Sequence, residues 1–248
     1  MTETVLRDAS RLQTARALLF DLDGVLTPTV EVHMRAWARL FAPYLEAQGA
    51  AAYTDDDYYL SIDGKPRVDG VRSLLTSRGI TLPDGTADDP AGEDTVWALG
   101  NRKNDAFAAE LAENGVAPYP GSLDFLTAAL AAGYEVAVVS SSRNAEPVLR
   151  AAGIRDRFEV IVDGLVAAAE GLPGKPAPDT YLRAAELLGL TADECVVVED
   201  AHSGVQAGRD GAFGLVVGID RGVGAQELLD SGADVVVEDL DELVASLR

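Results

Sequence analysis

From Gly121 onward, short apolar runs alternate with segments of helical pattern, and this alternation restricts the folds open to the chain. The apolar runs predict strands at 17–20, 134–139, 158–162, 195–198, 213–217 and 234–237. Helices are expected between these strands and, from Asp239, after the last of them, and several of the helices end at a glycine. Strands that alternate with helices of this length form parallel sheets covered by helices on both faces. The sequence therefore predicts an α/β fold with a mostly parallel sheet.

A block from about residue 28 to residue 117 does not follow this rhythm. Helical patterns cover 30–48, 69–77 and 95–113. The first of these has a possible apolar face formed by Trp37, Leu40, Phe41 and Leu45. The acidic stretch 82–95, rich in Gly and Pro, predicts a loop. We interpret the chain as a core built from residues 1–29 and 118–248, with residues 30–117 inserted as a helical domain. Short tethers at 27–29 and 116–118 would let this insert move as a lid. A fixed helical subdomain is the alternative.

Composition excludes several classes of partner. The 248 residues are 48% hydrophobic and carry a formal net charge of −21, which argues against binding to nucleic acid or an anionic membrane. No segment approaches the roughly 18 apolar residues of a membrane span. The single cysteine, Cys195, lies in an apolar run, so we expect it to be a core residue. One cysteine cannot form a disulfide within the chain, which indicates a reducing compartment. We expect a cytoplasmic protein that is a monomer or a small homo-oligomer.

Polar side chains follow several of the predicted strands. Asp21 and Asp23 come directly after the first strand, Ser140 follows another, and Glu199 and Asp200 follow a third. Parallel strands bring such residues to one edge of the sheet, where open α/β sheets bind ligands. We expect Lys175 to reach the same edge from its loop. Carboxylate oxygens suit Mg²⁺, whereas the Cys/His spacing of a zinc site and a Gly-rich phosphate loop are both missing from the sequence.

Four motifs in this order resemble those of the haloacid dehalogenase-like phosphotransferase superfamily. They are Asp-Leu-Asp-Gly-Val at 21–25, Ser140, Lys175 before a proline, and Glu199-Asp200. The resemblance implies a Rossmann-like parallel-sheet core with an inserted helical cap domain. The segments at 33–37, 102–105, 140–144, 174–179 and 199–204 are similar, more closely, to those of the β-phosphoglucomutase family.

The resemblance also implies roles for the core residues. Asp21 would be the nucleophile, and Asp23 would be the general acid and base. Ser140 and Lys175 would stabilise the phosphoryl oxygens during transfer. Mg²⁺ would be held or surrounded by Asp21, Glu199, Asp200 and the backbone carbonyl of Asp23.

Seven further residues are candidates for substrate binding. They are His33, Trp37, Lys65, Arg67, Ser142, Arg143 and Asn144. We align Arg67 with the arginine that binds the distal phosphate in the family, and Arg72 is the alternative. His33 and Trp37 lie one helical turn apart, a spacing that ordinary packing would also produce.

The resemblance predicts an enzyme that transfers phosphoryl groups through an aspartyl-phosphate with Mg²⁺ as cofactor. The predicted substrate is a small phosphorylated sugar, with β-glucose 1-phosphate converted to glucose 6-phosphate through a 1,6-bisphosphate. The alternative is a phosphatase that hydrolyses a sugar phosphate or another small phosphomonoester, because it would share every core residue. A phosphate-sensing or interaction protein is disfavoured, since the full catalytic set is present.

Overall fold

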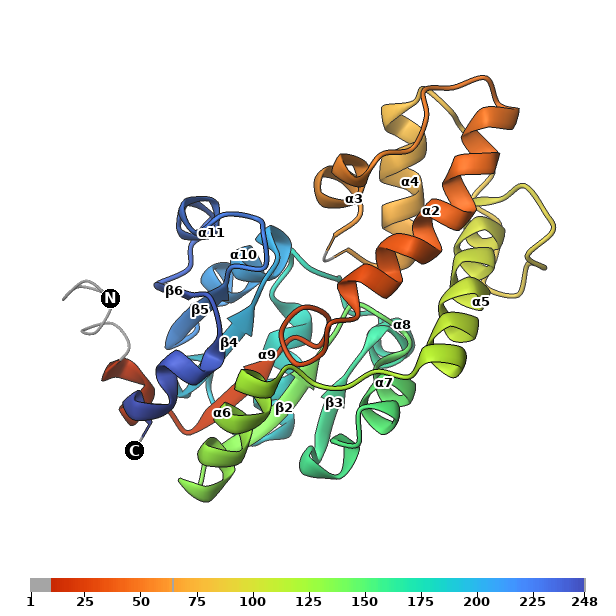
Figure 1. The fold of residues 1–248 in the computed structure, drawn as a ribbon. Coiled ribbons are helices and arrows are strands. Elements are labelled where there is room, and N and C mark those ends of the chain that lie inside the picture. The colour runs from red at the N-terminus through yellow and green to blue at the C-terminus, as the bar shows by residue number, and fades with distance from the viewer. Residues whose placement is uncertain (1–9, 64, 248) are drawn as a thin grey trace. The chain divides into compact units, whose positions relative to one another are not determined.

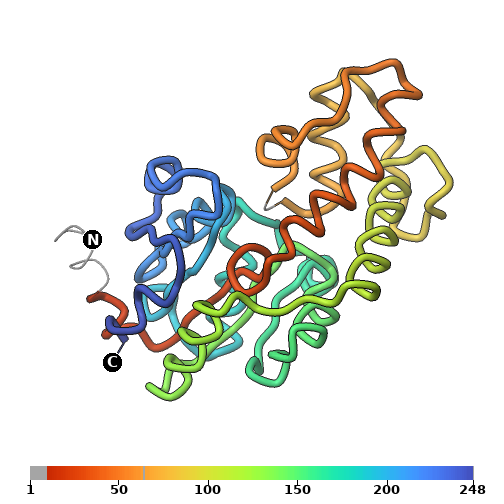
Figure 2. Tube along the Cα trace, in the orientation of Figure 1, coloured from red at the N-terminus to blue at the C-terminus, as the bar shows by residue number. Residues whose placement is uncertain are grey.

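The computed structural model describes residues 10–63 and 65–247, which form two compact units. Met1–Pro28 and Ala117–Arg248 make the first, here called the sheet unit, and Thr29–Val116 makes the second, here called the helical unit. Figure 2 shows the chain leaving the sheet unit once and returning to it once.

The sheet unit is built on a parallel sheet in which the described strands have the order β3-β2-β1-β4-β5-β6 (Figure 1). The strands are β1 (Ala17–Phe20), β2 (Glu135–Val139), β3 (Val160–Val162), β4 (Cys195–Glu199), β5 (Leu215–Ile219) and β6 (Val235–Val237). This order is that of a doubly wound Rossmann-like sheet, so the predicted α/β fold is confirmed. The strand expected at 213–217 begins two residues later, because the chain still turns at Gly214, packed against the Asp193 carbonyl.

Helices join the strands of this sheet. The α-helices are α6 (Pro120–Ala131), α7 (Ala145–Ala151), α8 (Gly164–Glu170), α9 (Asp179–Leu187), α10 (His202–Asp210) and α11 (Ala225–Ser231). The 3₁₀-helices are η1 (Ser10–Thr14), η2 (Arg155–Arg157), η3 (Ala192–Glu194) and η4 (Leu240–Ser246). Sequence patterns did not indicate α8, which begins where the Asp163 carboxylate accepts hydrogen bonds from two backbone N–H groups. The helix expected from Asp239 is the 3₁₀-helix η4 rather than an α-helix.

Alternation along β1 packs its side chains on both faces of the sheet. Leu19 belongs to a buried cluster with Tyr181 of α9, whereas Phe20 makes edge-to-face contacts with Phe125 of α6 and Phe158. Cys195 lies in the first cluster, and burial raises the pKa of its thiol to about 12. The prediction that Cys195 is a core residue is confirmed.

The helical unit contains α2 (Val30–Ala47), α3 (Asp55–Ser61), α4 (Arg67–Ser77) and α5 (Val96–Asn114). Its core includes Trp37, Phe41 and Leu45, which the sequence predicted as the apolar face of the first helix. One helix was not predicted, and the start of another was wrong. The helix α3 was missed, because its run of three aspartates reads as a polar loop, and α4 begins at Arg67 rather than at residue 69.

The segment 82–95 is a loop, as predicted. The Asn101 side-chain amide donates to the carbonyls of Ala87 and Asp89 at 3.1 and 3.0 Å, and the Thr95 hydroxyl donates to the Asp89 carboxylate at 2.6 Å. These bonds to α5 and its first turn give the loop a defined path.

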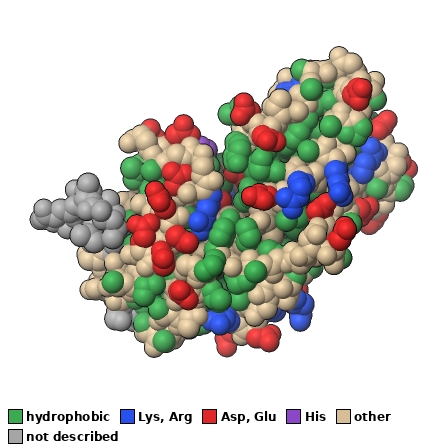
Figure 3. Space-filling model, viewed as in Figure 1, with side chains coloured by type: hydrophobic (Ala, Val, Ile, Leu, Met, Phe, Trp, Pro, Cys, Tyr) green, Lys and Arg blue, Asp and Glu red, His purple; other side chains and the backbone are tan. Residues whose placement is uncertain are grey.

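Acidic side chains are spread over the face drawn in Figure 3, and basic ones are fewer, as the net charge requires. Across residues 10–63 and 65–247, no helix combines the length and the apolar character that crossing a membrane would need.

Candidate active site

The carboxyl ends of β1 and β4 meet where the strand order of the sheet reverses, which is where open α/β sheets form a binding crevice. The ladder continues past β1, because the Asp21 N–H donates to the Val198 carbonyl at 2.9 Å. The Ser140 N–H likewise donates to the Val162 carbonyl at 3.0 Å. Backbone bonding thus fixes these two residues at the same edge as Glu199.

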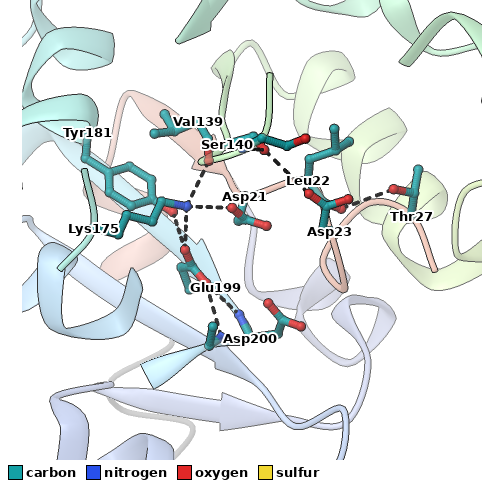
Figure 4. A network of polar contacts seen from close by, with 12 residues as sticks. Asp21, Leu22, Asp23, Thr27, Val139, Ser140, Lys175, Tyr181, Glu199 and Asp200 are labelled. Atoms are coloured by element: carbon teal, nitrogen blue, oxygen red, sulfur yellow. Dashed lines mark hydrogen bonds and ion pairs between the residues drawn. The ribbon is translucent and has the colours of Figure 1, made fainter. Parts of the chain in front are cut away.

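Lys175 is the centre of a buried polar network at this edge (Figure 4). Its ammonium donates to Asp21 Oδ1 at 2.5 Å, to Glu199 Oε1 at 2.6 Å and to the Val139 carbonyl at 2.9 Å. The same nitrogen lies 4.8 Å from the centroid of the Tyr181 ring. Lys175 therefore reaches the strand edge from its loop, as the sequence predicted, and joins residues from three strands.

Glu199 is held on both of its carboxylate oxygens. Oε1 accepts from Lys175 and from the Tyr181 hydroxyl, the latter at 3.0 Å. Oε2 accepts from the backbone N–H groups of Asp200 and Ala201, both at 3.1 Å. Four donors therefore hold the Glu199 carboxylate in one orientation. Glu199 thus acts as an anchor for the network.

Electrostatics at this edge favour an additional cation. Burial raises the pKa of Asp21 well above its usual value, and Glu199 and Asp23 add to the shift while Lys175 opposes it. Burial alone would lower the pKa of Lys175, but the carboxylates of Asp21 and Glu199 outweigh burial and raise it. Lys175 therefore stays an ammonium, yet it does not balance all the carboxylates around it.

The donor set fits Mg²⁺. Asp21, Glu199 and Asp200 each offer a carboxylate oxygen, and these atoms lie within 4.8 Å of one another. Three carboxylates and one ammonium leave a formal charge of −2, which a divalent cation would neutralise. Hard oxygen ligands of this kind suit Mg²⁺. The side chain of Asp23 is outside this group, so any contribution from Asp23 would come from its backbone carbonyl.

Asp23 lies in the turn that follows β1. The Ser140 hydroxyl makes a long hydrogen bond of 3.5 Å to Asp23 Oδ2. The next residue, Gly24, has φ +87°, and its N–H donates to the Thr27 carbonyl at 2.8 Å. A residue with a side chain would be strained there, so the glycine allows the sharp turn that separates the carboxylate of Asp23 from that of Asp21.

Ser142, Arg143 and Asn144 lie in the turn between β2 and α7, and all three are half-buried. The Ser142 N–H donates to the Ser140 hydroxyl, and the Asn144 N–H donates to the Ser142 hydroxyl, both at 3.1 Å. The backbone of Gly164 approaches Arg143 so closely that a β-carbon there would lie 2.9 Å from Arg143 Cγ. Hydrogen bonds therefore connect this turn to Ser140, and the side chains of its three residues are partly exposed to solvent.

His33 and Trp37 lie together inside the helical unit. The Lys103 amino group is hydrogen-bonded to His33 Nδ1, and the His33 ring stacks on Phe107 with centroids 4.2 Å apart. The Lys103 nitrogen also lies 5.2 Å from the centroid of the Trp37 ring, which itself stacks on Phe41. These contacts give both residues a packing role. They leave open whether His33 or Trp37 also contacts a substrate.

The basic residues near the start of α4 differ in their partners. The Lys65 ammonium donates to the Ser61 carbonyl at 3.0 Å. Arg72 is exposed and forms ion pairs with Asp69 at 2.6 Å and Asp84 at 3.0 Å. Arg67 is half-buried and donates to the Asn101 side chain at 3.0 Å, a neutral acceptor. Arg72 is already paired with two carboxylates, which makes it the weaker of the two candidates for binding an anion.

Some members of these networks were not identified from the sequence. Tyr181 is completely buried, and only its position on α9, six residues after Lys175, places it in the site. Gly204 is needed because a β-carbon at that position would lie 1.7 Å from Glu199 Oε1. Lys103, in the segment 102–105, was not among the candidate residues, although it is almost fully buried. A glycine three residues into a helix, as at Gly204, is a usable signal, whereas no local pattern indicates Tyr181.

Comparison with known proteins gives consistent matches over most of the chain. Residues 15–211 match the profile of the haloacid dehalogenase-like hydrolases. A protein of Mycobacterium tuberculosis named β-phosphoglucomutase is 51% identical over 243 residues, covering 94% of this chain and 92% of that protein. One of Bacillus subtilis with the same name is 31% identical over 232 residues, covering 94% and 93%. The crystal structure of β-phosphoglucomutase from Clostridium difficile superposes with a TM-score of 0.74 at 25% identity, covering 92% of this chain and 93% of that one.

The central role of Lys175 gives a first prediction. Lys175→Ala removes the ammonium that donates to Asp21 and Glu199, so we expect phosphoryl transfer from an aryl phosphate to fall about 10²- to 10³-fold. Two buried carboxylates would lose their partner, and the free energy of unfolding without added divalent cation should fall by about 3–5 kcal/mol. Steady-state kinetics and urea unfolding measure the two effects.

Lys175→Arg is the matched variant for this test. It keeps the positive charge, so it should recover part of the stability, but its larger planar head should not restore turnover at a site only 3% exposed. Undiminished turnover in Lys175→Ala would contradict the role given to this residue.

Proposed function

Because the chain belongs to the haloacid dehalogenase-like hydrolase family, we propose that it is a Mg²⁺-dependent β-phosphoglucomutase acting on a small phosphorylated sugar. The chain is an enzyme, and family membership together with its close relatives supports phosphoryl transfer as its chemistry. The proposed reaction converts β-glucose 1-phosphate to glucose 6-phosphate through the 1,6-bisphosphate. We place it in the cytoplasm, as an enzyme of carbohydrate metabolism.

One observation carries the proposal, namely the sharing of the Lys175 ammonium between Asp21 and Glu199 at the edge of the sheet. This contact orients one carboxylate oxygen of Asp21 and leaves the other to attack phosphorus. A carboxylate nucleophile splits one difficult transfer into two steps through an aspartyl-phosphate. Bound Mg²⁺ would neutralise negative charge on the phosphoryl oxygens.

The other residues have complementary parts in this proposal. The Lys175 ammonium and the Ser140 hydroxyl donate to the phosphoryl oxygens as charge develops on them. Asp23, in the turn after Asp21, protonates the leaving oxygen and later takes the proton from the incoming hydroxyl.

A mutase must also hold a second phosphate group. We propose that Arg67 of the helical unit binds it, because an arginine is suited to paired hydrogen bonds to phosphate oxygens. In the sheet unit, Ser142, Arg143 and Asn144 are further candidates for binding phosphate. In this proposal the helical unit, Thr29–Val116, is the cap of the enzyme. His33, Trp37 and Lys65 remain candidates for contact with the sugar.

Hydrolysis is the second candidate, and the match to a family described as hydrolases supports it. A phosphatase would use the same Asp21, Asp23, Lys175 and Mg²⁺, with water as the acceptor. The two reactions differ only in what attacks the aspartyl-phosphate, so the distinction requires a product analysis.

The decisive assay supplies β-glucose 1-phosphate, Mg²⁺ and a trace of β-glucose 1,6-bisphosphate. We expect glucose 6-phosphate to form much faster than inorganic phosphate, and chelation of Mg²⁺ to stop its formation. Coupled detection of glucose 6-phosphate and a colorimetric phosphate assay follow the two products in one reaction. Phosphate release as the main outcome across several monophosphates would instead identify a phosphatase.

The proposed role of Arg67 predicts a selective defect. Arg67→Ala should lower kcat/KM of the mutase reaction about 10- to 100-fold, because a charged hydrogen bond to the distal phosphate is lost. Hydrolysis of an aryl phosphate, which has no distal phosphate, should change little. Arg72→Ala is the matched control on the same helix and should leave both reactions near wild type. Equal losses in the two reactions with Arg67→Ala would refute the distal-phosphate role.

A further inference from the structure

Arg221 follows β5 and makes contacts with several segments of the sheet unit. Its Nε donates to the Gly24 carbonyl at 3.0 Å, and its Nη1 donates to the Glu238 carbonyl at 3.0 Å. Its Nη2 lies 3.3 Å from Asp239 Oδ1. The guanidinium carbon lies 3.9 Å from the centroid of the Tyr119 ring, within the range of a cation–π contact. Arg221 thus links residues 238 and 239, near the carboxyl terminus of the chain, to the turn that follows β1.

The next two carbonyls of that turn are also bound from outside it. The Ser122 hydroxyl donates to the Val25 carbonyl at 2.6 Å, and the Tyr119 N–H donates to the Leu26 carbonyl at 3.0 Å. Both donors lie at the start of α6, and Tyr119 is the residue on which Arg221 stacks. The carbonyls of residues 24–26 therefore accept hydrogen bonds from Arg221 and from the start of α6. The contact of Arg221 with Tyr119 links these two sets of donors.

Gly24 is the residue in this turn that directly follows Asp23. Its positive φ and its bond to the Thr27 carbonyl set the direction of the chain on one side. The bond from Arg221 to the Gly24 carbonyl sets the orientation of the following peptide plane. This peptide plane joins Gly24 to Val25, so its rotation would change ψ of Gly24, the residue next to Asp23. The turn that positions the Asp23 carboxylate would then shift.

We propose that Arg221 is a positioning residue for Asp23, holding the turn in the geometry in which Asp23 transfers a proton to or from the reacting oxygen. The proposal rests on the proposed function of Asp23 as general acid and base. Arg221 itself does not contact the reacting atoms. Its planar head makes three directed hydrogen bonds and a ring contact together, which a lysine cannot do.

Proton donation matters only when the leaving group needs a proton, and this gives a specific test. In single-turnover reactions with excess protein, we would measure phosphorylation of the protein by p-nitrophenyl phosphate and by β-glucose 1,6-bisphosphate. The nitrophenolate leaves as a stable anion, whereas the sugar oxygen has to be protonated. The variants are Arg221→Ala and Arg221→Lys, with Asp23→Asn as the reference for loss of the acid.

With the bisphosphate we expect Arg221→Ala to react about 10- to 100-fold more slowly, part of the roughly 10²- to 10⁴-fold that general acid catalysis contributes. With p-nitrophenyl phosphate the change should stay within about 3-fold, since proton donation adds little there. Arg221→Lys should react at nearly the same rate as Arg221→Ala, because lysine keeps the charge but lacks the planar guanidinium and its several N–H donors. Mg²⁺ affinity, measured by calorimetry, should equal that of the wild type.

Two further variants keep the test decisive. Tyr119→Leu removes the ring under Arg221 and should give a smaller loss of the same selective kind, which decides the question if Arg221→Ala does not fold. Arg183→Ala, which breaks exposed ion pairs with Glu170 and Glu186, should change neither reaction.

The outcomes separate this inference from the function on which it rests. Equal slowing with both donors in the Arg221 and Tyr119 variants, beside a selective loss in Asp23→Asn, would overturn the role of Arg221 and leave the proposed function intact. A wild-type protein that is not phosphorylated by the bisphosphate, or an Asp23→Asn variant without a selective loss, would instead overturn the proposed function.

Discussion

The site depends on one buried ammonium that two carboxylates share. Lys175 lies between Asp21 and Glu199, and almost no solvent reaches any of the three. Taking an unpaired charge out of water costs several kcal/mol, so neither carboxylate would be stable there without the lysine. Asp200 adds a further carboxylate, and one divalent cation would balance the formal charge of −2 that remains. Burial, with smaller contributions from Glu199 and Asp23, raises the pKa of Asp21. The excess of negative charge at the site favours the Mg²⁺ on which the proposed chemistry relies.

The topology of the sheet explains why these groups meet. The strand order reverses between β1 and β4, so the connections that leave these two strands run toward opposite edges of the sheet. A crevice is therefore left at the carboxyl ends of both strands. Asp21 extends β1 by one backbone hydrogen bond, and Glu199 is the last residue of β4. Beyond the strand, the turn at Gly24 carries Asp23 away from Asp21. Two carboxylates that are close in sequence therefore have different surroundings: one is bonded to Lys175, and the other accepts a long bond from Ser140.

Much of this arrangement was predictable from the sequence, because strand ends and their polar residues follow from local patterns. The parallel sheet, the position of Lys175 and the loop at 82–95 are confirmed. Tyr181 and Arg221 were not found, since each acts through contacts with residues far away in the chain that no local pattern encodes. The acidic helix α3 was missed for a different reason: its aspartates suggest a loop until Thr54 and Asp57 are seen to cap each other and Arg78 to pair with Asp57.

The central claim is that Asp21, oriented by Lys175, attacks phosphorus. The direct measurement is to mix the protein with β-glucose 1,6-bisphosphate and Mg²⁺, quench in acid within the first turnover, and locate the added phosphoryl group by peptide mass spectrometry. The account predicts a phosphoryl group on Asp21, lost on treatment with hydroxylamine and missing in Asp21→Asn. A phosphoryl group on any other side chain, or turnover by Asp21→Asn at the wild-type rate, would contradict it.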